Sequence, residues 1–382
     1  MAHIAIFCDG TWNSATAGSA THVLRLSTAC ARDLQQKVMY FEGVGTGTGR
    51  VSDLGRWLSK WGGGLFGWGL NRNIKAAYLA LCRCYRPGDK ILIFGFSRGA
   101  YTARSLAGMI RKCGILADPT PANLRRAFRL YRRRGPQNAP DAPHIRAARQ
   151  RLSPKFATSQ VDAMARGGES CLVRIAYVGV WDTVGALGIP ESLFGRWAAR
   201  WNMRYAFHDT RLSHLVESAR HAVALDERRR PYAPSLWGNL DDGDAGPGLN
   251  RGAEGPDRPY QQMWFVGDHG IIGGSARARE LTELTLAWIW QGAAAQGLQL
   301  KPGLSLPQIV PDPTVATTEI GDHSWIYRLL PMGLRWREGP RRAGDLDDSA
   351  RLRIAARPDY RPGSLRWLMP GLSRLDVDRT AR

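Results

Sequence analysis

The stretch that decides the fold reads Lys90-Ile91-Leu92-Ile93-Phe94-Gly95-Phe96-Ser97-Arg98-Gly99. Its first half is a continuous apolar run, which is typical of a strand buried on both faces in a parallel sheet. Residues 100–113 then carry apolar side chains at helical spacing. Gly95 and Gly99 flank Ser97 where a tight turn leaves no room for side chains. The stretch therefore predicts a strand, a sharp turn that presents Ser97, and a helix.

The rest of the chain alternates in the same way. Apolar runs predict further strands at 4–8, 38–41, 172–180, 220–225 and 262–266. Helical patterns fall at 22–36, 73–84 and 280–295. Strands that alternate with helices predict an α/β fold with a mostly parallel sheet flanked by helices.

Three regions interrupt this alternation. Residues 119–159 are rich in Arg, Pro and Ala and predict a helical insertion, while 240–259 are rich in Gly, Asp and Pro and predict an exposed loop. From residue 301 onward the chain is rich in Pro and Arg without a clear pattern. We therefore expect one α/β domain at 1–300, with an insertion around 119–159, and a C-terminal extension at 301–382 packed on it.

The chain is strongly basic, with a formal net charge of +20 in 382 residues. Such a charge can hold a protein to phospholipid headgroups, nucleic acid or an acidic partner protein. The basic residues are 46 Arg and only 7 Lys, and a genome-wide codon bias explains such an excess equally well. Composition alone therefore identifies no partner.

The compartment is predicted from the cysteines and from the apolar runs. The 6 cysteines are scattered without a CxxC pair, which favours free thiols in a reducing cytoplasm over disulfides or a metal site. The first residues lack the basic start and cleavage site of a signal peptide, and no apolar run is long enough to span a membrane. We expect synthesis as a soluble cytoplasmic chain, so that any export would use a route other than general secretion.

Ser97 becomes a nucleophile only when a base removes its proton, and an acid must orient that base. In proteins with such a turn the chain order is Ser, then Asp or Glu, then His. Asp182 follows the strand predicted at 172–180, and His269 follows the strand predicted at 262–266 within a glycine-rich loop. Both lie where parallel strands end, which is where active sites of such sheets form. We predict Ser97, Asp182 and His269 as a catalytic triad; a helix-capping role for Asp182 is the alternative.

The negative oxygen that forms during ester cleavage needs two N–H donors. One is expected from Arg98, the residue after the nucleophile, and the other from the loop after an early strand. Thr11 or Gly10 is the expected second donor, because both follow the strand at 4–8. Asp9 is expected to brace this loop, with cation binding as the alternative.

Together these residues resemble a bacterial α/β-hydrolase family of formerly unknown function that includes catalytic domains of type VI secretion lipase effectors. The resemblance rests on blocks at 7–13, 43–47, 95–104, 179–185, 221–227 and 264–269. It implies an α/β-hydrolase-like domain with Ser97, Asp182 and His269 as triad, and ester hydrolysis with phospholipid as the substrate class. Family members tend to carry an Asp two positions after the histidine, whereas Ile271 stands there in this chain.

The sequence thus predicts a serine esterase or phospholipase that needs no metal or organic cofactor. A thioesterase or amidase with the same triad, and a non-catalytic basic binding module on the same scaffold, are the alternatives. An aromatic, glycine-rich cluster lies near Trp57, and an aromatic cluster with nearby arginines, including Arg337, lies near Trp325. Both suit either peripheral membrane contact or core packing. A secretion or immunity partner protein is an open expectation, and no specific nucleic acid is expected.

Overall fold

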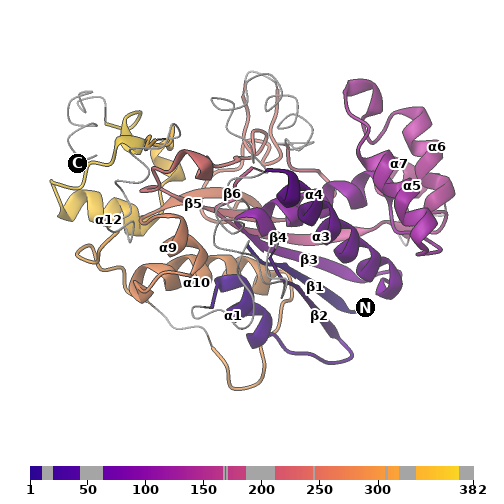
Figure 1. The fold of residues 1–382 in the computed structure, drawn as a ribbon, viewed down its shortest axis with the longest axis horizontal. Coiled ribbons are helices and arrows are strands. Elements are labelled where there is room, and N and C mark those ends of the chain that lie inside the picture. Colours follow the sequence, from indigo (N-terminus) through magenta and orange to yellow (C-terminus); the bar gives the residue numbers. More distant parts are fainter. Residues whose placement is uncertain are drawn as a thin grey trace.

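A computed structural model describes residues 1–10, 20–43, 63–166, 168, 171–185, 211–243, 246–305, 309–317 and 333–369. Six strands form one parallel sheet in the order β2-β1-β3-β4-β5-β6 (Figure 1). They are β1 (His3–Cys8), β2 (Gln36–Phe41), β3 (Lys90–Phe96), β4 (Arg174–Trp181), β5 (Ala219–Ala224) and β6 (Tyr260–Phe265). The predicted α/β fold with a mostly parallel sheet is confirmed, and each strand lies within two residues of its predicted limits.

Helices cover both faces of this sheet (Figure 1). Ile4 and Ile6 of β1 belong to a core shared with α3 (Gly63–Cys84) and α4 (Arg98–Cys113). The alternate residues Ala5 and Phe7 belong to a core shared with α1 (His22–Ala29) and α10 (Arg279–Ala295). Successive strand residues point to opposite faces, so a continuous apolar run packs side chains into the core on each face of the sheet.

Two predicted helix limits were wrong. α1 ends at Ala29 and not at residue 36, because the Asp33 carboxylate accepts the N–H groups of Gln35 and Gln36 and forms a turn that leads into β2. α3 begins at Gly63, ten residues before the predicted start at 73. Its glycines lower helix propensity and hid that start.

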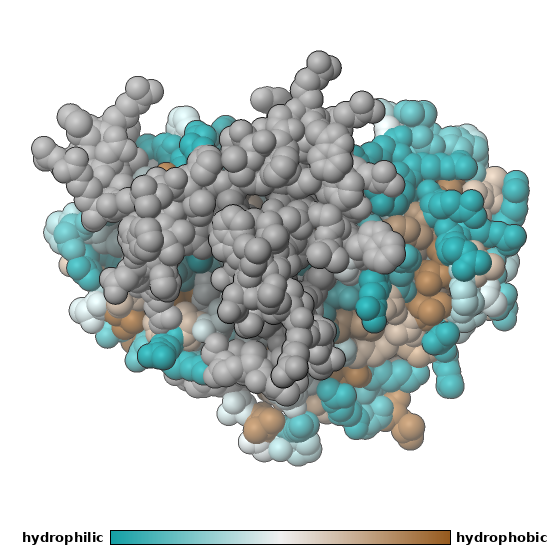
Figure 2. All heavy atoms as spheres, in the orientation of Figure 1, coloured by the Kyte–Doolittle hydropathy of each residue, from teal (hydrophilic) through white to brown (hydrophobic). Residues whose placement is uncertain are grey.

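The region predicted as a helical insertion contains α5 (Pro121–Tyr131), η1 (Pro136–Asn138) and α6 (Pro143–Leu152), and α7 (Gln160–Met164) follows. Leu130, Tyr131 and Ile145 pack into the core that contains α4. Arginines point outward from α5, including Arg125, Arg126 and Arg129. Figure 2 shows hydrophilic side chains over this end of the molecule.

The C-terminal segment, residues 333–369, packs beside β5 and β6. It contains η4 (Ala343–Asp345), α12 (Asp348–Ala356) and η5 (Gly363–Leu365). Leu346, Ala350 and Leu365 share a core with Val223 of β5 and Trp264 of β6. The segment thus lies near the strand ends that precede residues 182 and 269, while the domain limit at 300 stays a prediction.

Candidate active site

Ser97 occupies a strained turn between β3 and α4. Its φ is 57° and its ψ is −122°, a region that side-chain-bearing residues rarely adopt. Among the described residues, positive φ outside glycine occurs at Ser97, Asp182 and Arg251. Such strain persists only where the surroundings impose it, and it concentrates at functional sites.

The two glycines beside Ser97 are required by close backbone approach. A Cβ on Gly95 would lie 2.5 Å from the carbonyl oxygen of Gly99. A Cβ on Gly99 would lie 2.1 Å from the carbonyl oxygen of Cys8 and 2.4 Å from that of Asp9. The missing side chains therefore let the loop after β1 press against the start of α4.

The structure brings Ser97, His269 and Asp182 into one hydrogen-bonded chain. His269 Nε2 lies 2.8 Å from Ser97 Oγ, and His269 Nδ1 lies 2.5 Å from Asp182 Oδ2. Ser97 follows β3, Asp182 follows β4, and His269 begins α9 (His269–Gly273) after β6. All three therefore lie at the carboxyl edge of the sheet, although they are up to 172 residues apart in sequence.

Aromatic rings hold the imidazole of His269 in place. The ring of Phe96 lies 4.7 Å away and the ring of Tyr232 lies 4.6 Å away, measured between centroids. The His269 backbone N–H also donates to Glu227 Oε2 at 3.2 Å. Sequence reasoning did not assign Tyr232 or Glu227 to the site.

Asp182 is fully buried and accepts several hydrogen bonds. The backbone N–H of Ala224 donates to Oδ1 at 2.9 Å. Arg337 donates from Nη1 to Oδ1 at 2.6 Å and from Nη2 to Oδ2 at 2.8 Å. Burial by itself raises the pKa of Asp182, but the charge and hydrogen bonds of Arg337, with the hydrogen bond to His269, bring that pKa well below its usual value.

His221 supports the turn that follows Asp182. Its Nε2 accepts the Thr183 backbone N–H at 3.1 Å, and its Nδ1 lies 3.0 Å from Gln262 Oε1. Desolvation lowers the pKa of His221 to about 3, so the ring is neutral and can accept this bond. His221 therefore has a packing role. Of the other histidines between Asp182 and the C-terminal segment, His214 lies beside Arg111, with 3.2 Å between His214 Nε2 and Arg111 Nη2, and His208 and His323 lie outside the described residues.

The structure describes two of the three residues that were predicted as N–H donors to the oxyanion, Arg98 and Gly10. Arg98 is the first residue of α4, and first-turn N–H groups are not used by the carbonyls of their own helix. The N–H of Gly10 donates to Asp9 Oδ1 at 2.6 Å and is therefore already used. Thr11 lies outside the described residues.

Asp9 braces the loop after β1. Its Oδ2 accepts hydrogen bonds from Thr21 Oγ1 and Tyr40 Oη, each at 2.7 Å. Burial raises the pKa of Asp9, although these bonds act in the opposite direction. Among the described residues no cluster of His, Cys, Asp or Glu could hold a metal ion.

The loop that carries His269 is held by acidic side chains. Asp268 Oδ1 accepts the N–H groups of Gly270 and Ile271, each at 3.0 Å. This carboxylate therefore caps the N-terminus of α9. Asp226 Oδ2 accepts the Gly267 N–H at 2.6 Å, and Tyr360 Oη of the C-terminal segment donates to Asp226 Oδ1 at 2.9 Å.

Asp226 gives a pH-dependent stability that can be measured. Desolvation raises its pKa to about 7, against the bonds from Gly267 and Tyr360. A carboxyl group with a raised pKa is protonated more readily in the folded state than in the unfolded state. Its contribution to the free energy of unfolding is therefore complete at about pH 4 and below, and it is lost as the pH rises to about 7. Between about pH 5 and pH 8, ionisation of Asp226 should lower the free energy of unfolding by on the order of 2 kcal/mol. We expect Asp226→Asn to remove this contribution.

Urea unfolding at the two pH values measures this difference. Asp257→Asn, which changes an exposed carboxylate, is the matched control and should keep the wild-type dependence. An equal fall in wild type and in Asp226→Asn would contradict the prediction.

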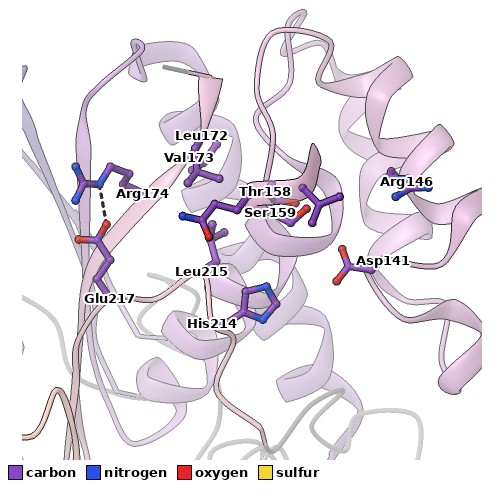
Figure 3. Close-up of a pocket in the computed structure, with 12 residues that line it drawn as sticks. Asp141, Arg146, Thr158, Ser159, Leu172, Val173, Arg174, His214, Leu215 and Glu217 are labelled. Carbon is purple, nitrogen blue, oxygen red and sulfur yellow. Dashed lines mark hydrogen bonds and ion pairs between the residues drawn. The ribbon is translucent and has the colours of Figure 1, made fainter. Parts of the chain in front are cut away.

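A pocket of about 540 Å³ lies at the other end of the sheet (Figure 3). Its lining includes Arg174, which begins β4, and Glu217, which accepts a hydrogen bond from Arg174 Nε at 2.7 Å. Asp182 follows the opposite end of β4, and a strand of this length extends roughly 25 Å. The pocket is therefore separate from the site around Ser97, and none of the predicted site residues line it.

A family model matches most of the chain and identifies the family to which it belongs. The family model described as "T6SS, Phospholipase effector Tle1-like, catalytic domain" matches residues 2–292. The chain belongs to this family. An uncharacterized protein of Saccharomyces cerevisiae, YEL023C, is 30% identical over 251 residues, which cover 61% of this chain and 34% of that protein.

Two solved structures are similar to this family member. One is an uncharacterized protein from Pseudomonas aeruginosa, with a TM-score of 0.46 and 15% identity over 78% of this chain and 46% of that one. The other is the Tle1 effector bound to the VgrG spike of the type 6 secretion system, with a TM-score of 0.35 and 17% identity over 71% of this chain and 50% of that one. The chain thus spans between a third and a half of the length of these relatives. Among its described residues no helix is long and apolar enough to cross a membrane.

Proposed function

We propose that this chain is a serine hydrolase that cleaves acyl ester bonds of phospholipids with Ser97, His269 and Asp182. The observation that carries the proposal is the hydrogen-bonded chain from Ser97 through His269 to Asp182 at the carboxyl edge of a parallel sheet. Membership in a family of phospholipase effector catalytic domains supports the substrate class. Since that family is one of type VI secretion effectors, the proposal extends to export outside the general route and to a secretion or immunity partner protein.

Acylation begins at Ser97. As Oγ attacks the ester carbonyl carbon, His269 Nε2 takes its proton across the 2.8 Å contact. The carbonyl oxygen becomes negative and is stabilised by the backbone N–H of Arg98 and by a second donor, for which we retain Thr11. When the tetrahedral intermediate collapses, the bond to the lysophospholipid oxygen breaks and that oxygen receives the proton from His269.

Deacylation uses the same groups in reverse. His269 removes a proton from water, the hydroxide attacks the acyl carbon, and the fatty acid leaves as the proton returns to Ser97 Oγ. Asp182 holds Nδ1 of the imidazole, so that Nε2 faces the serine, and stabilises the imidazolium that forms in each half of the reaction. The two reaction steps together consume only the substrate and water.

The substrate class is tested with vesicles of phosphatidylethanolamine and phosphatidylglycerol and with short acyl esters, acyl thioesters and acyl amides. We expect free fatty acid and lysophospholipid as products, and His269→Ala should lower the rate by roughly 10³-fold or more. His214→Ala is the matched control, because His214 lines the separate pocket. Release of a phosphorylated headgroup, or activity on thioesters or amides alone, would contradict the proposed bond.

A further inference from the structure

Arg337 brings a positive charge from the C-terminal segment to the buried carboxylate of Asp182. The two residues lie 155 positions apart, and Arg337 lies beyond the residues 2–292 that match the family. Its two terminal nitrogens bind the two carboxylate oxygens at 2.6 and 2.8 Å. A planar guanidinium makes such a paired contact, which an ammonium group cannot reproduce.

The same guanidinium is fixed by backbone carbonyl groups. Nη1 also donates to the Ala224 carbonyl at 2.9 Å, and Nη2 to the Tyr232 carbonyl at 2.6 Å. The side chain is only 3% exposed. Arg337 therefore does not face solvent as a membrane contact would, and its terminal N–H groups are used by Asp182 and these carbonyls, so it reaches the reaction only through Asp182.

The backbone around Arg337 is anchored on both sides. Leu334 forms an antiparallel bridge with Arg229, and the Arg335 N–H donates to the Arg228 carbonyl at 2.7 Å. On the other side, Arg366 Nη2 donates to the Arg337 carbonyl at 2.8 Å. These contacts fix the position from which the side chain reaches Asp182.

We propose that Arg337 is a positioning residue that fixes the orientation of Asp182 and offsets its charge, so that the C-terminal segment completes the active site. This inference rests on the proposed function of the triad. It assigns a role in the reaction to a part of the chain outside the matched region.

Asp182 stabilises the imidazolium that forms at His269 during the reaction. Arg337 offsets part of the charge of this carboxylate, so its removal should change the pH dependence of turnover. Other charged or titratable groups around the pair come from several elements. They are Arg98 and Arg104 on α4, His221 on β5, Asp226, Glu227 and Arg229 after β5, Tyr232 of η3 (Arg230–Tyr232), and Asp268 before α9. Glu227 is paired with Arg229, and within the described part of the chain Arg337 is the arginine that pairs with Asp182.

The test measures kcat/KM against pH for a soluble p-nitrophenyl acyl ester with the full chain. In Arg337→Gln we expect the midpoint of the acidic limb to rise by about one pH unit and the plateau to fall roughly 10- to 100-fold. An NMR titration of the His269 imidazole in the Ser97→Ala background should show the same upward movement without turnover. Arg337→Lys keeps the charge but loses the paired contact, so its midpoint should move less while its plateau still falls about tenfold.

Arg353→Gln is the matched control, because Arg353 is a buried arginine of the same segment that donates to the Val315 carbonyl and does not bond to Asp182. It should keep the wild-type midpoint even if thermal stability falls. A folded Arg337→Gln protein with wild-type midpoint and plateau overturns the inference. If that variant does not fold, unchanged kcat/KM in Arg337→Lys overturns it. Absence of Ser97-dependent hydrolysis in the wild type overturns the proposed function instead, and the inference with it.

Discussion

We expect Ser97→Ala to lower kcat for acyl ester hydrolysis by roughly 10³- to 10⁶-fold, because the variant lacks the hydroxyl proposed as nucleophile at the turn. The alanine keeps the turn, since Cβ is present in both residues and the strained φ of 57° is unchanged. KM and the thermal unfolding midpoint should therefore change little. The measurement is hydrolysis of a chromogenic acyl ester together with covalent labelling by a fluorophosphonate probe, which should vanish in the variant.

Ser105→Ala is the matched control for this result. Ser105 is a buried serine on the same helix, α4, and its substitution should leave both kcat and labelling near wild type. Labelling of Ser97→Ala at the wild-type level would place the reactive serine elsewhere and would reject the triad.

Asp182→Asn should lower kcat by roughly 10⁴-fold. An amide group at this position can donate a hydrogen bond to Nδ1, which favours the tautomer in which Nε2 carries the proton and cannot accept one from Ser97. The substitution also leaves the buried guanidinium of Arg337 without its counter-ion, and removal of one partner of a buried ion pair costs about 3–5 kcal/mol of stability. Rates have to be compared at a temperature at which the variant is folded, as verified by circular dichroism.

Asp162→Asn separates these two effects. Asp162 is a buried carboxylate of α7 that pairs with Arg149 and Arg166, and its neighbours Gln160 and Val161 line the pocket that is separate from Ser97. Its substitution should lower stability and leave kcat of the folded protein unchanged. If Asp182→Asn behaved in the same way, Asp182 would have a structural role only.

The parts of the fold that depend on local pattern could be predicted from sequence. The apolar run before Gly95, the glycine spacing around Ser97 and the helical pattern after it give β3, the turn and α4 without reference to any distant residue. Asp182 and His269 were found because each follows an apolar run, and parallel strands bring their carboxyl ends to one edge. The start of α3 was missed because its glycines have low helix propensity.

Arg337 could not be found in the same way. It is one of 46 arginines, no helix or strand pattern precedes it, and its partner lies 155 positions away. The Gly10 N–H also could not be assigned, since its use by Asp9 depends on the side-chain rotamer of its neighbour. The first depends on packing between distant segments, and the second on the contacts that hold the Asp9 carboxylate to Thr21 and Tyr40.

The position of Arg337 in the chain has a consequence for the order of biosynthesis. Ser97, Asp182 and His269 leave the ribosome before Arg337 does, so the nascent chain carries the triad while Asp182 still lacks its counter-ion. An unpaired buried carboxylate disfavours the folded arrangement, and translation of the segment that carries Arg337 removes that penalty. The triad is therefore expected to become competent only after residue 337 has left the ribosome.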